Sequence, residues 1–203
     1  MIHNSRQKGF SLLEVIIVVA MAVGVLFVVV SLRGSVGTLQ DIISQKLESR
    51  RDLDQTFQIL VTEIRSAGPS SAGAYPIEAA GSSTLTFYSD IDKDDIFEKV
   101  RYFLATSTIK RGVIEPSGNP LTYATSSEVV TTVVENLILS TSTSIFEYYD
   151  SAYTGLEAPM TIPIDVTRVR IVRVSVLADV APGKAPKPTL FTNTITIRNL
   201  RSN

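Results

Sequence analysis

Residues 9–32 read GFSLLEVIIVVAMAVGVLFVVVSL, and this stretch decides the fold because the rest of the chain must be built around it. From Phe10 to Leu32 the only charged side chain is that of Glu14. An α-helix crosses the hydrocarbon layer of a bilayer with about 20 apolar residues, so this stretch is long enough to span a membrane. A carboxylate at the centre of such a helix costs at least ~2.5 kcal/mol and by default marks a function or a partner. Because Glu14 lies just over one turn into the run, we expect a smaller cost and a positive group brought by another molecule.

The residues before the apolar run indicate its orientation. No Asp or Glu precedes the run, whereas three basic residues do: His3, Arg6 and Lys8. The positive-inside rule therefore predicts a cytoplasmic N-terminus, with everything after Leu32 outside. A cleaved secretory signal is the competing interpretation, because the small-residue triplet Ala20-Met21-Ala22 resembles a cleavage site. The apolar run continues for roughly ten residues past this triplet and contains Glu14, so we favour a retained anchor.

The residues around Glu14 form a specific motif. Residues 8–15, KGFSLLEV, combine a basic leader that ends in Gly9 with an aromatic Phe10 and the acidic Glu14 four residues later. This motif resembles the processing site of type IV prepilins and of type II secretion pseudopilins. The resemblance implies that a prepilin peptidase cleaves between Gly9 and Phe10 on the cytoplasmic side, and that the new amino group of Phe10 is then methylated.

The same resemblance implies a partner for Glu14. In this family the carboxylate pairs with the N-terminal amine of a neighbouring subunit as helices pack into a filament core. The physics agrees, because a charge-assisted pair in a medium of low dielectric is more favourable than either charge alone. A plain membrane anchor with an unrelated Glu remains the alternative.

Length and composition bound the rest of the chain. Of its 203 residues, about 170 remain after the leader and the anchor, enough for one outer domain with its own core. Nineteen Lys and Arg against twenty Asp and Glu give a net charge of −1, so the overall balance shows no nucleic-acid footprint. The chain has no Cys, which excludes disulfides and thiolate sites.

Beyond the anchor, apolar residues continue at helical spacing. Most are separated by three or four residues: Val36, Leu39, Ile43, Leu47, Leu53, Phe57, Leu60, Ile64 and Ala67. Charged residues lie between them and predict a solvated opposite face. Gly68 and Pro69 predict the end of the helix, because Gly favours the position after a helix C-terminus and Pro cannot continue it. We predict one helix from about Phe10 to Ala67, on the order of 85 Å long at ~1.5 Å per residue, with two separate helices as the alternative.

The remaining residues predict antiparallel strands. Residues 69–82 are predicted to be a loop because they are rich in Pro, Gly, Ser and Ala. Residues 127–139 are ambiguous, since their β-branched residues favour a strand whereas Ser127 with apolar residues at helical spacing favours a short helix. A loop is predicted at the Pro-rich residues 181–188. Strands are predicted at residues 83–88 and 99–104, which form a hairpin around an acidic turn, and then at 108–114, 144–149, 166–177 and 190–198.

The predicted fold class is therefore α+β, a long N-terminal helix packed against an antiparallel β-sheet head, as in pilins. We expect a leader at residues 1–9, a membrane or filament-core half of the helix at 10–32, an amphipathic half at 33–68 and a β-rich head at 69–203. Several segments resemble the larger minor pilins and the J-type minor pseudopilins: residues 65–68, 85–90, 100–104, 110–111 and 198–199.

The acidic turn is the one candidate for a metal site. Asp90, Asp92 and Asp94 alternate as at the start of a calcium-binding loop. With Asp90 in the first position of an EF-hand, Asp95 would replace the required Gly and Arg101 the bidentate Glu, so an EF-hand is excluded. A looser Ca²⁺ site with Glu98 as a further ligand remains open, and a solvated hairpin turn is the favoured interpretation.

Signals for catalysis or nucleic-acid binding are weak. The single His is His3, inside the expected leader, so the mature chain would have no His-based triad or zinc site. A carboxylate pair such as Glu63 with Asp90 remains open as a glycosidase-like dyad. Two basic clusters, Arg168-Arg170-Arg173 and Lys184-Lys187, suit DNA. Because Arg168 and Arg170 would alternate on a strand, a solvated sheet face is favoured.

The sequence thus predicts a structural minor pilin or pseudopilin without enzymatic activity or a cofactor. The resemblance implies four kinds of partner: other pilin-like subunits, a prepilin peptidase, an inner-membrane assembly platform and the membrane. The subunit is expected in the inner membrane and then in a pilus or pseudopilus. The alternative is a single-pass, membrane-anchored binding protein that does not polymerise.

Overall fold

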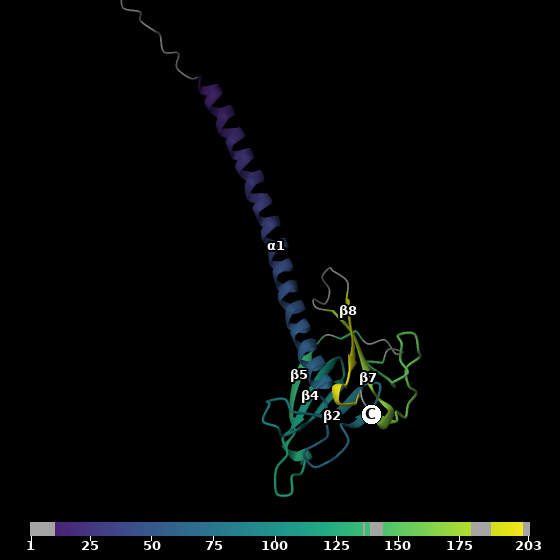
Figure 1. The fold of residues 1–203 in the computed structure, drawn as a ribbon. Helices are drawn as coiled ribbons and strands as arrows, with labels where there is room; N and C mark the ends of the chain where they lie inside the picture. Colours follow the sequence, from purple (N-terminus) through teal and green to yellow (C-terminus); the bar gives the residue numbers. More distant parts are fainter. Residues whose placement is uncertain (1–10, 136, 139–143, 180–187, 201–203) are drawn as a thin grey trace, which may run out of the picture. The chain divides into compact units, whose positions relative to one another are not determined.

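The computed structural model describes residues 11–135, 137–138, 144–179 and 188–200, with the backbone alone for residues 32–50 and 52. The chain divides into two compact units, residues 1–48 and residues 49–203. One helix, α1 (Leu12–Arg65), precedes all the strands (Figure 1). The predicted fold class, a long N-terminal helix followed by antiparallel β-sheets, is confirmed.

The helix ends at Arg65, close to the predicted Ala67. Gly68 was expected to terminate the helix by adopting a left-handed conformation, but it does not do so. Its φ is not in the left-handed region that a helix-terminating Gly adopts. A Cβ placed on Gly68 would lie 2.6 Å from Cε1 of Phe97 and 3.0 Å from the Asn199 side chain. Gly68 is therefore needed for close packing. Asn199 Nδ2 also donates to the carbonyl oxygen of Ala67 at 2.9 Å.

Five strands form the first sheet, in the order of the chain and with every neighbour antiparallel. They are β1 (Ile77–Ala80), β2 (Thr84–Ser89), β3 (Glu98–Ala105), β4 (Thr108–Ile114) and β5 (Val129–Val134). The predicted hairpin and the strand at 108–114 are confirmed. The loop predicted at residues 69–82 is wrong in its last third, because β1 lies there and pairs with β2. Its Ile77 is buried opposite Phe87, a contact that local composition does not reveal.

Within the ambiguous residues 127–139, Val129–Val134 form a strand. A 3₁₀ turn at Thr125–Ser127 precedes β5, and all six residues of β5 are Val or Thr, which are β-branched. Pairing with β4 therefore decides between the two alternatives. Residues 136 and 139 lie outside the described residues.

Three strands form the second sheet, in the order β6 (Phe146–Tyr149), β7 (Ile171–Ala178) and β8 (Thr189–Thr196). The strand predicted at 166–177 begins later than expected, because Val166–Arg168 is a 3₁₀ turn that Asp165 caps. Within β7, alternate residues are buried, as the period of two predicts. Most of the loop predicted at 181–188 lies outside the described residues.

The core of the second unit lies between the two sheets and the last turns of α1. In Figure 1, β5 lies to the left of the end of α1, and β7 and β8 lie to its right. The apolar stripe of α1 supplies four buried residues: Phe57, Leu60, Val61 and Ile64. Phe57 stacks on Phe191 of β8 with ring centroids 5.5 Å apart. From Phe57 to Ile64 the predicted stripe is therefore the contact face of the helix, and Val61 adds to it.

Candidate functional site

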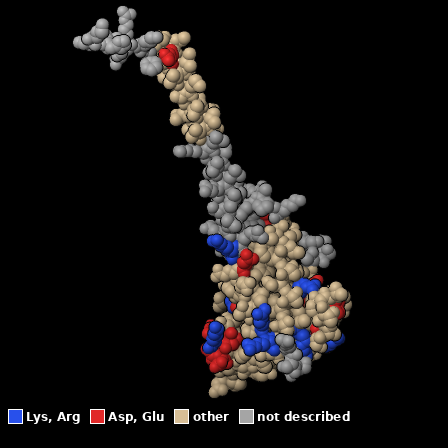
Figure 2. Space-filling view, turned by 45° about the horizontal axis from the view of Figure 1, so that its top comes forward, with Lys and Arg blue, Asp and Glu red and all other residues tan. Residues whose placement is uncertain are grey.

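The apolar part of α1 is the first candidate site. Leu12–Ser31 has a mean hydropathy of 3.0 and none of it is buried within the chain, so it is long and apolar enough to cross a membrane. This helix is therefore a membrane anchor or a signal sequence. Glu14 lies in the first turn and is the one charged residue among residues 11–31. The described part of the helix that lies farthest from the head is tan in Figure 2, the colour of uncharged residues, apart from one red acidic spot. Gly9 and Phe10, the predicted processing site, lie outside the described residues.

The apolar part of the helix offers Glu14 no cation. Residues 11–31 contain no Lys or Arg. The backbone N–H of Glu14 donates to the carbonyl oxygen of Ser11 at 3.0 Å, which places its carboxylate at the helix N-terminus, where the helix dipole favours negative charge. The arrangement can therefore hold a carboxylate on an otherwise apolar surface, ready for a cation from another molecule.

A buried polar cluster links α1 to the first sheet. Glu63 of α1 accepts from Arg111 of β4, at 2.5 Å from Nη2 to Oε1 and 3.1 Å from Nε to Oε2. The hydroxyl of Tyr102, on β3, donates to Glu63 Oε2 at 2.7 Å. Burial raises the pKa of Tyr102, and the charge of Glu63 adds to this effect. Burial opposes the charge of Arg111, but its bonds to Glu63 outweigh this and its pKa is raised.

Glu63, one of the two carboxylates suggested from the sequence as a glycosidase-like dyad, is hydrogen-bonded within this cluster. Both oxygens of Glu63 are engaged by Arg111 and Tyr102. Asp90 instead accepts three backbone N–H groups of its own turn, those of Lys93, Asp94 and Asp95. Glu63 and Asp90 thus bind different groups, and the partners of Glu63 could not be found from sequence spacing.

Part of the predicted calcium cluster comes together in the acidic turn. Carboxylate oxygens of Asp90, Asp92 and Glu98 lie within 4.8 Å of one another, whereas Asp94 is not in this group and accepts the N–H of Ile96. Burial raises the pKa of Glu98, the charges of Asp92 and Asp94 add to this, and the N–H of Ile91 opposes it. Ca²⁺ takes about six to eight oxygen ligands, of which these three carboxylates would supply a part. Calcium binding here therefore stays the less favoured alternative to a solvated turn.

The basic residues that were predicted to alternate on a strand do not do so. Arg168 lies in the 3₁₀ turn before β7 and pairs with Asp150 at 2.7 Å, and Arg170 precedes the first residue of β7. Arg173, on β7, pairs with Glu147 at 3.4 Å and lies over the ring of Tyr149 at 4.9 Å. The two pairs neutralise much of this charge locally. Lys184 and Lys187 lie outside the described residues.

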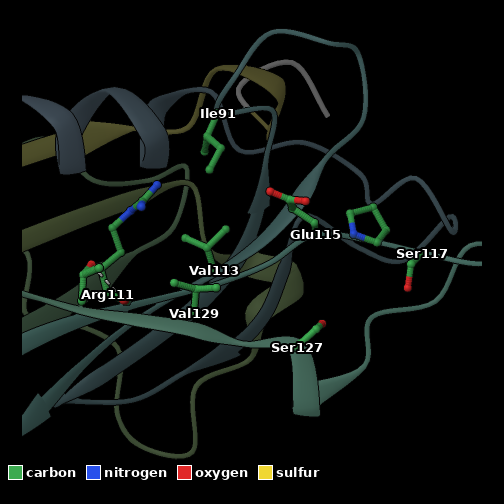
Figure 3. Close-up of a pocket in the computed structure, with 9 residues that line it drawn as sticks. Ile91, Arg111, Val113, Glu115, Ser117, Ser127 and Val129 are labelled. Atoms are coloured by element: carbon green, nitrogen blue, oxygen red, sulfur yellow. Dashed lines mark hydrogen bonds between the residues drawn. The ribbon is translucent and has the colours of Figure 1, made fainter.

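A cavity of about 450 Å³ opens beside β4 and β5, and sequence reasoning missed it. Figure 3 shows Val113 of β4 and Val129 of β5 on one wall, Ile91 of the acidic turn opposite, and the carboxylate of Glu115 turned towards the space between them. Arg111 lines the end next to α1. The one sequence signal for the cavity is an apolar Ile91 within an acidic turn.

Comparison of the chain with models of known protein families and with curated proteins gives no match.

Proposed function

We propose that the chain is a minor pilin or pseudopilin, a structural subunit that assembles into, or initiates, a type IV pilus or a type II secretion pseudopilus. The observation that carries the proposal is the apolar helix segment Leu12–Ser31, which has every side chain exposed and a single acid, Glu14, in its first turn. The residues KGF stand before this helix at positions 8–10. The motif supports processing by a prepilin peptidase. The exposed apolar segment supports anchoring in the membrane and then polymerisation.

Energetics favour two successive environments for the helix. Burying a Leu, Val or Ile side chain contributes about 1.5–3 kcal/mol, so a helix with this many exposed apolar residues requires lipid or neighbouring helices. Lipid provides no cation for Glu14. A bundle of identical or related helices buries the apolar surface equally well and adds the N-terminal amine of a neighbour. Glu14 therefore favours the filament over the membrane and sets the axial position of each subunit.

The proposal divides the chain by role. Residues 1–9 are the leader, 10–32 the membrane and filament core, 33–68 the amphipathic half of the helix and 69–203 the head. The precursor lies in the inner membrane with its N-terminus in the cytoplasm. Its partners are a prepilin peptidase, an assembly platform and other pilin-like subunits, and its role is structural, without catalysis.

Mass spectrometry of the mature N-terminus tests the processing step. The chain is coexpressed with a prepilin peptidase and purified from the membrane fraction. We expect the first residue to be N-methylated Phe10. A Gly9→Leu variant, which blocks the cleavage position, serves as the control and should retain Met1. An unprocessed N-terminus in the presence of active peptidase contradicts the proposal.

Variants of Glu14 test the assembly step separately. Glu14→Gln keeps the shape of the side chain but removes the charge, and we expect normal processing with at least about tenfold less subunit in sheared filaments, equivalent to a loss of about 1.4 kcal/mol. Ser11→Ala, at the residue just before α1, is the matched control and should assemble normally. Normal incorporation of Glu14→Gln would contradict the role of the charge.

The cavity beside β5 favours a second candidate function, a membrane-anchored binding protein that does not polymerise. A hollow of about 450 Å³ lies in the volume range of ligand pockets, and both apolar and polar residues line it. An N-terminus that keeps Met1 together with a head that binds a ligand would support this candidate instead.

A further inference from the structure

The outer strand of the first sheet is an open edge. The sheet ends at β5, and within the described part of the chain no strand pairs with its other side. Alternate residues of such an edge direct their N–H and C=O groups away from β4. Val129 is 66% exposed and Val130 44% exposed. Natural proteins usually protect an edge with Lys, Pro or a bulge. The six residues of β5 contain neither Lys nor Pro, and the register shift with β4 lies between Thr132 and Val134, at the other end of β5 from Val129 and Val130.

The cavity adjoins this edge on the face of the sheet that carries Arg111. Val113 pairs with Val129, and Arg111 pairs with Thr131, so all four residues lie on one face. All four line the cavity. A strand added to β5 would direct alternate side chains to the same face. An edge for main-chain pairing next to a pocket for alternate side chains is the arrangement by which proteins bind extended peptides.

The size of the cavity fits two side chains. A water molecule takes up about 30 Å³ in the liquid, so about 450 Å³ corresponds to roughly 15 waters, more than one side chain fills. Residues two apart on a strand are about 6.6 Å apart, close enough for both to enter the same hollow. The apolar walls suit an aliphatic side chain or the stem of a long one.

The charge around the cavity is negative. Among the described residues, the exposed carboxylate of Glu115 has no hydrogen-bond or ion-pair partner. Residues 90–95, which flank Ile91 on the opposite wall, contain four Asp and one Lys. The cation that lines the cavity, Arg111, is already neutralised by Glu63 at 2.5 Å. A basic side chain is therefore the complement of this pocket.

We infer that the edge of β5 and the adjoining cavity dock an extended, basic segment of a partner protein. The segment adds a strand to β5. It places a Lys or Arg with its stem on Val113 and Val129 and its charge at Glu115, and the residue two positions away fills the rest of the cavity. This inference does not depend on filament assembly, since it concerns the head alone.

Binding of a designed peptide to the full chain in detergent micelles tests the inference. The probe is a fluorescein-labelled peptide of about eight residues, enough to cover β5, with Thr at odd positions and Lys and Val alternating at even ones. Fluorescence anisotropy measures its affinity. We expect a dissociation constant in the micromolar range, and at least about tenfold weaker binding when both Lys are replaced by Glu. No binding of the Lys peptide up to about 1 mM overturns the inference.

Two N-methylated versions of the peptide test strand addition without altering the protein. Methylation of the odd amides blocks one edge of the peptide, and methylation of the even amides blocks the other. Since a strand pairs with β5 through one edge only, we expect one version to lose binding and the other to keep it. If both versions bind like the parent peptide, the association is merely electrostatic and the inference is overturned.

Charge reversal in the protein tests the pocket. Glu115→Lys should weaken the Lys peptide at least about tenfold and strengthen the Glu peptide. Asp54→Lys, on an exposed position of α1, changes the net charge equally and should alter neither affinity. Equal effects of the two variants overturn the inference. So does concentration-dependent dimerisation that the peptide cannot reverse, because the occupant would then be a second copy of the chain.

Discussion

Glu63 of α1 and Arg111 of β4 form a two-bond ion pair that is largely removed from water. The bonds are 2.5 and 3.1 Å long, and the side chains are 9% and 20% exposed. Tyr102 completes the cluster from β3. The pair therefore fixes the last turns of the helix on the first sheet through a polar contact inside an otherwise apolar interface.

Removing one partner of this pair should destabilise the head strongly. We expect Arg111→Met to lower the free energy of unfolding by roughly 3–5 kcal/mol, because it leaves the Glu63 carboxylate buried without a cation. Urea denaturation of the chain in detergent, followed by tyrosine fluorescence, measures the change. The control is Arg168→Met, whose lost ion pair is 62% exposed on the Arg side and should cost less than about 1 kcal/mol. Similar losses for both variants would contradict the expectation.

Gly68 should tolerate no side chain. In Gly68→Ala the new Cβ would lie 2.6 Å from Cε1 of Phe97, and overpacking of this kind costs about 1–3 kcal/mol. The same denaturation assay measures this loss. In a Phe97→Leu background, which removes the ring, the cost of Gly68→Ala should fall. An unchanged cost in that background would show that the clash with Phe97 is not the cause.

Glu98 should make the head more stable as the pH falls below neutrality. Its pKa is raised, mainly by burial, so the folded chain holds this proton at a higher pH than the unfolded chain does. The cost of burying the charge is fully present above the folded pKa and disappears as the pH falls through it towards the ordinary value of 4.5. Relative to Glu98→Gln, the parent chain should therefore gain stability between pH 7 and 4.5. Urea midpoints of the two proteins across this range measure the effect, and parallel curves would contradict it.

Glu157 should titrate in the opposite direction. A hydrogen bond from the Thr154 hydroxyl, with further bonds from backbone N–H groups, lowers its pKa to about 2. Its stabilising effect is complete above the ordinary value of 4.5 and is lost as the pH falls through about 2. Carbon NMR of the side-chain carboxyl should give a midpoint near 2 in the parent chain and a higher one in Thr154→Ala. Equal midpoints would exclude the hydroxyl as the main cause.

Sequence periodicity was sufficient for most of the fold because its signals are local. The stripe of α1 and the alternation in β7 each reflect one buried face of one element. β1 escaped prediction because it has only four residues, two of them Ala, and depends on pairing with β2. The purpose of Gly68 also escaped it, because Phe97 and Asn199 approach from distant parts of the chain.

The candidate sites also divide into those with a local sequence signal and those that depend on contacts between distant residues. Glu14 stands out from sequence because a charge among apolar residues is visible without any tertiary contact. The partners of Glu63 are 39 and 48 positions away, and only the folded sheet brings them together. The cavity likewise depends on the register between β4 and β5, which places Val113 opposite Val129.

The bond from Asn199 to Ala67 joins residues 132 positions apart, and the neighbouring Leu200 is only 3% exposed. Contacts between such distant residues form late, since the intervening chain must first be brought together. During synthesis, the contacts of Asn199 and Leu200 with the rest of the head cannot form until residue 200 has been added. The described residues after β8 hold the end of the helix in place through Asn199 and Leu200. A chain truncated before them would leave that end of the helix exposed.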